Sequence, residues 1–270
     1  MSTRDEYPAG VPCWVETLQP DPRAALDFYG PLLCWELSEP GPMPGGLPGE
    51  YVVARVDGLA VAGIGALPDV GQPPFAVWNT YVRVDDVDAA ADRATTAGAT
   101  LLLGPFDAAG GGRLAVLADP AGAAFSVGDA RSRPGAERVN EPGAWAMSSL
   151  HTPDPPGANA FYGTLFGWRS EPIAPGAPVT LLRLAGHVGG EPGQPFPRDV
   201  VAVMTSTEQG PGAPAVPPHW NVNLRVGDAD AVAAHAAQLG GSVLVAPMDA
   251  MGLRNAVLLD PQGAAFSISS

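Results

Sequence analysis

The sequence repeats itself over most of its length. The stretch Asp21–Gly30 (DPRAALDFYG) returns as Asp154–Gly163 (DPPGANAFYG), and the segment Trp78–Val127 returns as Trp220–Ile268. The second copy lacks one residue, at the place where the first copy has its glycine run 110–112. A long aligned copy of this kind indicates duplication of a whole structural unit. We therefore expect chemistry at equivalent places in the two halves, and a difference between the halves is itself informative.

The length and composition suit two domains of ordinary size. The chain has 270 residues, of which 46% are hydrophobic and 16% are charged, which is ample for two filled cores. Its 34 glycines and 31 prolines favour many turns and short strands over long helices. We place the first domain at residues 8–130, a polar linker at 131–142 and the second domain at 143–270.

The charge and the apolar pattern exclude several classes of partner. The formal net charge is −14 and there is no cluster of lysine and arginine, so the surface repels phosphate backbones and anionic lipids. No apolar run approaches the roughly 18–20 residues that cross a bilayer, and the polar N-terminus is unlike a secretory signal. Cys13 and Cys34 are expected to be reduced thiols. We expect a cytoplasmic monomer or homodimer that binds neither nucleic acid nor membranes.

Local patterns predict a β-α-β-β-β unit that occurs twice in each half. Asp21 can cap a helix that has Pro22 at its first position, and Asp86 can cap an alanine-rich helix that ends at Gly98. Asp57-Gly58 suits a tight hairpin turn, and Asp119-Pro120-Ala121-Gly122 suits a type I turn. The predicted fold class is α+β, with strands in the first half near residues 13–18, 51–56, 60–64, 78–84, 100–103, 113–118 and 123–127.

Two motifs carry a resemblance to a known family. Phe28–Trp35 (FYGPLLCW) returns as Phe161–Trp168 (FYGTLFGW), and each half ends in a turn of the form Asp-Pro-x-Gly-Ala-x-Phe. The chain resembles the vicinal-oxygen-chelate superfamily of glyoxalases, bleomycin-resistance proteins and dioxygenases, and in particular its tandem-domain actinobacterial members. The resemblance implies, for each domain, two β-α-β-β-β units that form a curved, partly closed sheet around a cavity.

The resemblance also implies where a metal would bind. Metal-using relatives carry His, Gln or Glu ligands on the first strand of each unit and on the last strand. Indole, thioether, amide and hydroxyl groups stand at these positions here, and they are poor ligands for hard divalent ions. We therefore predict no metal and no cofactor in either half. The positions concerned are Trp14, Asn79 and Ser126 in the first half and Met147, Asn221 and Ser267 in the second.

The same strands predict the lining of a cavity. Alternate residues of a strand share a face, and aromatic walls with a few polar groups suit a flat organic ligand. The first half is expected to be the better site, because Glu16 beside Trp14 can accept hydrogen bonds. In the alternative interpretation the aromatic residues fill the barrel, Glu16 faces solvent and Arg113 bonds to backbone or solvent. The candidate ligand-binding residues are Trp14, Glu16, Asn79, Tyr81, Arg113, Met147, Ser149, His219, Asn221 and Asn223.

Three classes of function remain open. The first is metal-free binding of a small hydrophobic or aromatic metabolite or antibiotic, of the resistance or sequestration type. The second is an enzyme of the same superfamily, lyase, isomerase or hydroxylase-like, acting on a small secondary metabolite. In that case His151 or His219 is the candidate for proton transfer, and no catalytic residue is otherwise assigned. The third is a scaffold that acts through protein contacts.

Overall fold

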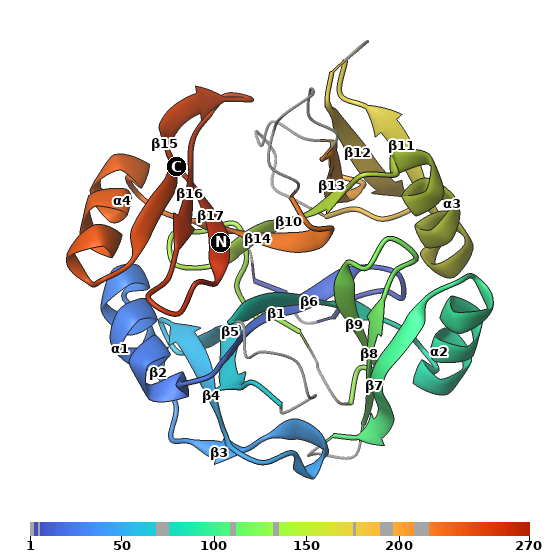
Figure 1. Ribbon diagram of the computed structural model, residues 1–270, viewed down its shortest axis with the longest axis horizontal. Coiled ribbons are helices and arrows are strands. Elements are labelled where there is room, and N and C mark those ends of the chain that lie inside the picture. Colours follow the sequence, from blue (N-terminus) through green and yellow to red (C-terminus); the bar gives the residue numbers. More distant parts are fainter. Residues whose placement is uncertain are drawn as a thin grey trace.

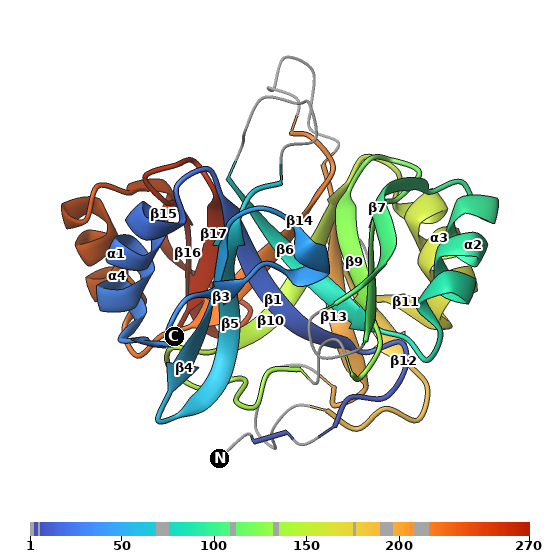
Figure 2. The same ribbon diagram turned by 90° about the horizontal axis from the view of Figure 1, so that it is seen from below.

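Two curved sheets lie back to back, one from each half of the chain, with a pair of helices on either side (Figures 1 and 2). The computed structural model describes residues 3–4, 6–68, 76–108, 112–131, 135–174, 177–189, 197–207 and 216–270. The concave face of each sheet points away from the other sheet (Figure 1). We call these concave faces the first cup and the second cup.

The elements follow the duplication closely. The first half contains β1 Pro12–Gln19, α1 Pro22–Leu33, β2 Glu36–Leu37, β3 Gly41–Pro42, the short 3₁₀ helix η1 Pro44–Gly46, β4 Glu50–Val56, β5 Leu59–Ala66, β6 Val77–Arg83, α2 Val87–Thr96, β7 Thr100–Asp107, β8 Arg113–Ala118 and β9 Ala124–Gly128. The second half contains β10 Trp145–Thr152, α3 Pro155–Phe166, β11 Trp168–Pro172, β12 Val179–Leu184, β13 Val200–Ser206, β14 His219–Arg225, α4 Ala229–Gln238, β15 Ser242–Ala250, β16 Leu253–Leu259 and β17 Ala265–Ser269. None of the described helices is long and apolar enough to cross a membrane.

The helices begin where the sequence predicts. The Asp21 carboxylate accepts from the first backbone N–H groups of α1, and Pro22 occupies a position whose missing N–H costs nothing. Asp154 caps α3 by accepting from the backbone N–H of Gly157. Asp86 and Asp228 cap α2 and α4 through the backbone N–H three residues further on.

The predicted turns also form. Asp57 and Gly58 have φ values of 49° and 77°, the left-handed conformation that a two-residue hairpin between β4 and β5 requires. In the turn before β9, Asp119 Oδ1 accepts from the backbone N–H groups of Ala121, Gly122 and Ala123 at 2.8–3.0 Å. One carboxylate oxygen thus fixes the whole turn.

Each sheet is built from the strands of one half. The first sheet has nine strands in the order β2-β4-β5-β1-β6-β9-β8-β7, with β3 paired to β4 off this path. The second has eight strands in the order β11-β12-β13-β10-β14-β17-β16-β15. The fold is therefore α+β with two tandem domains and open sheets, and the two β-α-β-β-β units of each half pair with each other in one sheet.

The family motifs, by contrast, join the two halves. Tyr29 of α1 is fully buried; its hydroxyl donates to Asp260 Oδ2 at 2.9 Å and accepts from Trp78 Nε1 at 3.0 Å. Tyr162 of α3 repeats the arrangement, donating to Asp119 Oδ2 and accepting from Trp220 Nε1, both at 3.0 Å. Each Tyr-Gly motif is thus bonded to the Asp-Pro turn of the opposite half.

The motif tryptophans complete this reciprocal interface. Trp35 Nε1 donates to the Gly143 carbonyl at 2.6 Å, and Trp168 Nε1 donates to the Gly10 carbonyl at 2.7 Å. Helix α1 packs on α4 and α2 packs on α3, as Figure 1 shows at its two sides. The backs of the sheets, the helices and both copies of each motif therefore form one continuous buried interface.

Candidate ligand-binding site

The floor of the first cup is formed by the adjacent strands β1 and β6. They run antiparallel, and their register places Glu16 opposite Asn79 and Trp14 opposite Tyr81. The intervening Thr80 faces the other way, because its hydroxyl lies 2.8 Å from the hydroxyl of Ser148 in the other half. The structure therefore brings together the four first-half residues that strand alternation predicts on one face.

A single carboxyl group organises this floor. Glu16 Oε2 accepts from the Tyr51 hydroxyl at 2.8 Å, and Glu16 Oε1 accepts from the Tyr81 hydroxyl at 2.6 Å. Trp14 Nε1 donates to the Tyr51 oxygen at 3.0 Å. The polar atoms of three aromatic side chains thus converge on one acidic group.

Tyr51 is a member of this group that sequence reasoning missed. It reaches the floor from β4, and its hydroxyl lies over Gly63 of β5, where any Cβ would overlap the phenol oxygen. The requirement for glycine is thus set by close approach of a side chain. The only sequence signal for Tyr51 in the site is that the next strand, residues 59–66, contains two glycines, which leave room for a large neighbouring side chain.

The floor of the first cup is buried. The exposed fractions are 4% for Trp14, 2% for Glu16, 5% for Asn79 and 4% for Tyr81. Glu16 therefore does not face solvent at an exposed rim, which was the alternative open from the sequence.

Asn79 contributes an acceptor that lacks a donor. Its Nδ2 donates to Ser126 Oγ at 2.8 Å and lies 3.5 Å from Glu16 Oε1. This orientation of the amide is the favourable one, because the opposite one would place two oxygens side by side. The buried Asn79 Oδ1 has no hydrogen-bond partner among the residues that the structure describes. A buried acceptor left unpaired costs about 1–3 kcal/mol, so this oxygen calls for a donor.

A short segment covers the first cup. Met43 is 3% exposed and lies beside Gly65 of β5. Gly45 of η1 lies so close to Phe106 of β7 that a Cβ there would overlap the ring, and its φ of 71° also favours glycine. Residues 43–51 therefore lie across the cup, from one edge of the sheet to the other.

The floor of the second cup is polar and more open. The register of β10 and β14 places Met147 opposite Asn223 and Ser149 opposite Asn221. Met147, Ser149 and Asn223 are partly exposed, unlike their first-half counterparts. Asn221 Nδ2 donates to Ser267 Oγ at 2.6 Å, which repeats the contact between Asn79 and Ser126. The second half thus keeps the amide–serine pair but has neither the carboxylate nor the aromatic group around it.

Two histidines lie at the end of this floor. His151 and His219 face each other across β10 and β14 with ring centroids 4.7 Å apart and planes inclined by 3°. His151 Nε2 lies 3.2 Å from Ser149 Oγ, and His219 Nδ1 lies 2.8 Å from the Pro217 carbonyl. Burial lowers the pKa of His151 to about 4, and the neighbouring His219 adds to the shift. His151 is therefore a neutral imidazole at neutral pH.

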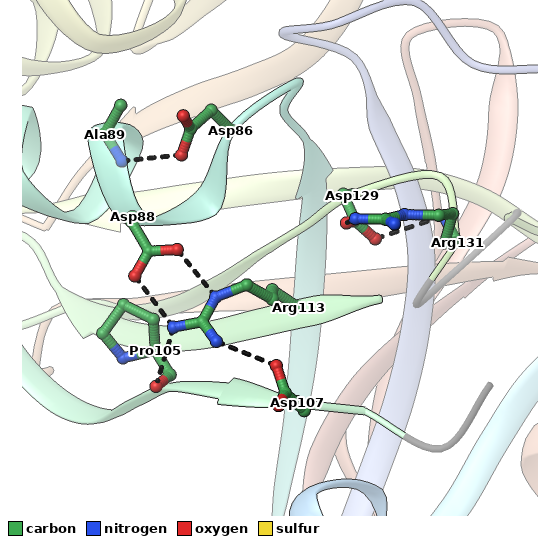
Figure 3. A network of polar contacts seen from close by, with 8 residues as sticks. All are labelled: Asp86, Asp88, Ala89, Pro105, Asp107, Arg113, Asp129 and Arg131. Atoms are coloured by element: carbon green, nitrogen blue, oxygen red, sulfur yellow. Dashed lines mark hydrogen bonds and ion pairs between the residues drawn. The ribbon is translucent and has the colours of Figure 1, made fainter. Parts of the chain in front are cut away.

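Arg113 lies apart from both floors. Its guanidinium pairs with Asp88 at 2.6 Å and with Asp107 at 2.8 Å, on the face of the sheet that carries α2 (Figure 3). The equivalent Arg254 pairs with Asp230 and Asp249. Among the candidates from the sequence, Arg113 is the one that the structure does not bring to a cup.

The inferred metal positions do not fit a metal. In the first half they hold an indole donating to Tyr51, and an amide and a hydroxyl bonded to each other. The second half offers a thioether and a second amide–hydroxyl pair. The described part of the chain contains no group of three His, Cys, Asp or Glu side chains placed to hold a metal ion. We therefore derive no step through a metal.

The paired β-α-β-β-β units around each cup define the class of protein. Residues 14–127 match the family model described as the Glyoxalase/Bleomycin resistance protein/Dioxygenase superfamily, and residues 135–269 match the model described as a Glyoxalase-like domain. The chain belongs to this superfamily, with one such domain in each half.

Two curated proteins are similar along their whole length. The chain is 39% identical to CFP32 of Mycobacterium tuberculosis, whose name describes it as a glyoxylase, over 99% of this chain and 97% of that protein. It is 34% identical to the anthracycline biosynthesis protein DnrV of Streptomyces peucetius, over 97% of this chain and 94% of that protein.

Solved structures share the fold at low identity. The Mn(II)-bound glyoxalase from Novosphingobium aromaticivorans superposes with a TM-score of 0.61 at 17% identity, covering 97% of this chain and 82% of that one. The 2,2',3-trihydroxybiphenyl 1,2-dioxygenase from Sphingomonas wittichii gives a TM-score of 0.59 at 14% identity, covering 97% and 90%. At such identities the likeness concerns the fold alone.

Proposed function

We propose that the protein binds a small aromatic metabolite or antibiotic without a metal, in the first cup, through hydrogen-bond donors of the ligand. The observation that supports this most directly is the acceptor pair on the floor. Glu16 is a buried carboxyl group, and the neighbouring Asn79 Oδ1 has no described donor. A phenol or amine of a ligand supplies the donor that the Asn79 oxygen requires, and the Glu16 carboxyl beside it can accept a further hydrogen bond.

The surroundings of the acceptor pair suit a flat ring. Trp14, Tyr51 and Tyr81 present large, rigid surfaces whose polar atoms are already engaged within the group. Aromatic side chains of this kind stack on planar ligands, while a few placed polar atoms set the orientation. The relative named for anthracycline biosynthesis is consistent with such a ligand, because anthracyclines are flat, hydroxylated polycyclic compounds.

Entry of a ligand requires movement of the covering segment. Met43 and Tyr51 fill the space above Gly65 and Gly63. Binding then exchanges these side chains for the ligand, so the ligand must supply contacts that favour the open form.

A titration with an anthracycline tests the site. We expect Glu16→Gln to weaken binding at least about tenfold, the equivalent of one hydrogen bond to a charged group. The matched control is Ser149→Ala at the equivalent position of the second half, and it should leave the affinity unchanged. Far-UV circular dichroism of both variants checks that they fold. Loss of binding in Ser149→Ala with normal binding in Glu16→Gln would place the site in the second cup and contradict the proposal.

Elemental analysis tests the absence of a metal. The protein, dialysed after purification, is expected to contain well under one equivalent of zinc, iron, nickel or manganese per domain. About one retained equivalent per domain would refute metal-free binding and would require ligands outside the positions inferred above.

A second candidate function rests on the second cup. The neutral His151, bonded to Ser149 and stacked on His219, is placed to accept a proton from a ligand on that floor. The relative described as a glyoxylase agrees with an enzyme of this class. Mass spectrometry of an anthracycline incubated with the protein separates the two functions. A changed product that disappears in His151→Gln favours the enzyme, and an unchanged ligand favours binding alone.

A further inference from the structure

A small cavity lies at the interface between the halves. It is found where the N-terminal arm, the described residues 3–4 and 6–11 that precede β1, meets the second domain. It has a volume of about 60 Å³. The residues used in this inference, Arg4 and Tyr7 of the arm, Trp145 of β10 and His187 after β12, all line it. No site described above uses Arg4, Trp145 or His187.

Trp145, which lines the cavity, carries a donor that lacks an acceptor among the described residues. The Trp145 side chain is 6% exposed, and its Nε1 has no hydrogen-bond partner among the residues that the structure describes. Two other tryptophans at the interface between the halves do have acceptors, because Trp35 Nε1 donates to the Gly143 carbonyl and Trp168 Nε1 donates to the Gly10 carbonyl. A buried N–H without an acceptor costs about 1–3 kcal/mol, which favours occupation of the cavity by an acceptor.

Two basic groups converge on the same space. A Cβ built on Gly189 would meet both the His187 ring and a terminal nitrogen of Arg4, so these groups lie around one point of the backbone. Burial lowers the pKa of His187, and the charge of Arg4 adds to the shift. Asp199 acts in the opposite sense but is already paired with Arg183 at 2.8 Å. Among the residues that the structure describes, the donors of this cavity therefore outnumber the acceptors placed to receive them.

The arm is held in place over this cavity. Thr3 forms a bridge with Arg138, and the Arg4 backbone N–H donates to the Glu137 carbonyl at 3.0 Å. The Arg4 guanidinium lies 5.6 Å from the centroid of the Tyr7 ring, and the Tyr7 hydroxyl donates to the Ala136 carbonyl at 2.8 Å. The charge of Arg4 is thus positioned by the backbone and by an aromatic ring.

We propose that this cavity binds a small carboxylate anion, whose oxygens accept from Arg4, His187 and Trp145. The proposal is independent of the ligand of the first cup. The volume admits a few waters or one molecule of the size of acetate, because a single water needs about 10–15 Å³. The planar guanidinium of arginine suits a carboxylate better than a spherical ion, since it can donate two parallel hydrogen bonds.

The indole N–H groups report binding directly. The full-length protein with ¹⁵N-labelled tryptophan, in a buffer free of carboxylates, is titrated with acetate, and acetamide serves as the neutral analogue of the same shape. The chain has six tryptophans, so Trp145→Phe identifies the relevant signal. We expect acetate to shift the Trp145 signal saturably and acetamide to leave it unshifted.

Two variants test the role of the charge. Arg4→Gln should weaken acetate binding at least about tenfold, the effect of losing one charge-assisted hydrogen bond. The matched control is Arg23→Gln, whose exposed side chain lies on α1, and it should not change the affinity. The melting temperature provides a second measurement, and acetate should raise it in the parent but not in Arg4→Gln. An unshifted Trp145 signal, an equal response to acetamide, or an unchanged affinity in Arg4→Gln would overturn the proposal and leave water as the occupant.

Discussion

The reciprocal tyrosine bonds predict an unequal cost for two equivalent substitutions. Tyr29→Phe and Tyr162→Phe each remove one hydroxyl from a fully buried ring that otherwise keeps its packing. Each leaves a tryptophan N–H, of Trp78 or Trp220, without its acceptor. That loss alone costs about 1–3 kcal/mol.

The carboxylates distinguish the two sites. Asp260 Oδ2 also accepts from Gln19 Nε2 at 2.7 Å, so it keeps a donor when Tyr29 is changed. Asp119 Oδ2 has Tyr162 as its described side-chain donor, and burial already raises the pKa of Asp119. We therefore expect Tyr29→Phe to lower the free energy of unfolding by about 2 kcal/mol and Tyr162→Phe by about 3–4 kcal/mol.

Equilibrium unfolding in urea, followed by tryptophan fluorescence and circular dichroism, measures both values. Tyr7→Phe is the control, because the Tyr7 hydroxyl makes one bond to a backbone carbonyl, worth about 1 kcal/mol. If all three variants lose the same free energy, or if Tyr29→Phe costs more than Tyr162→Phe, the reasoning from the carboxylate partners is wrong.

Two further predictions concern pH. Burial raises the pKa of Tyr29 well above its ordinary value, so above about pH 10 the unfolded chain loses this proton and the folded chain keeps it. The free energy of unfolding should then fall by up to about 1.4 kcal/mol per pH unit for this tyrosine. Urea titrations at alkaline pH measure this slope, and Tyr29→Phe should reduce it. The pKa of His151 is lowered to about 4, so the unfolded chain takes up this proton first as the pH falls from about 6.5. His151 should therefore contribute about 2–3 kcal/mol to the decrease in the free energy of unfolding by pH 4; His151→Gln should make the decrease smaller by about this amount, and the control His235→Gln should leave it unchanged.

Much of the fold could be predicted because its signals are local. A capping aspartate, a proline at the first helical position and a two-residue hairpin act within a few residues, and all of them form where the sequence places them. Strand alternation predicts the grouping of Trp14, Glu16, Asn79 and Tyr81 correctly, because a face is a property of the strand itself.

The remainder of the site depends on contacts between distant segments. Tyr51 of β4 bonds to Glu16 of β1 across the intervening strand β5, and the cover by residues 43–51 follows from how a loop returns over the sheet. Arg113 is predicted in the cavity lining, although strand alternation already indicates otherwise. Arg113, Ala115 and Leu117 share one face of β8, and the buried Ala115 and Leu117 face the helices and not the cup. The partner of Arg113, Asp88, by contrast, comes from an element that spacing alone does not position.

The division between repeated and diverged residues has a structural explanation. The interface has an approximate twofold arrangement, so the bonds that the motif tyrosines and tryptophans make across it occur twice, and each motif is present in both halves. Tyr29 donates to Asp260 and Tyr162 donates to Asp119, and loss of either tyrosine hydroxyl removes the acceptor of a buried tryptophan N–H, that of Trp78 or Trp220. The cup floors face away from each other (Figure 1), so we expect no such coupling between Glu16 and Ser149. The motifs that reveal the family therefore hold the halves together, while the ligand chemistry lies in residues that differ between them.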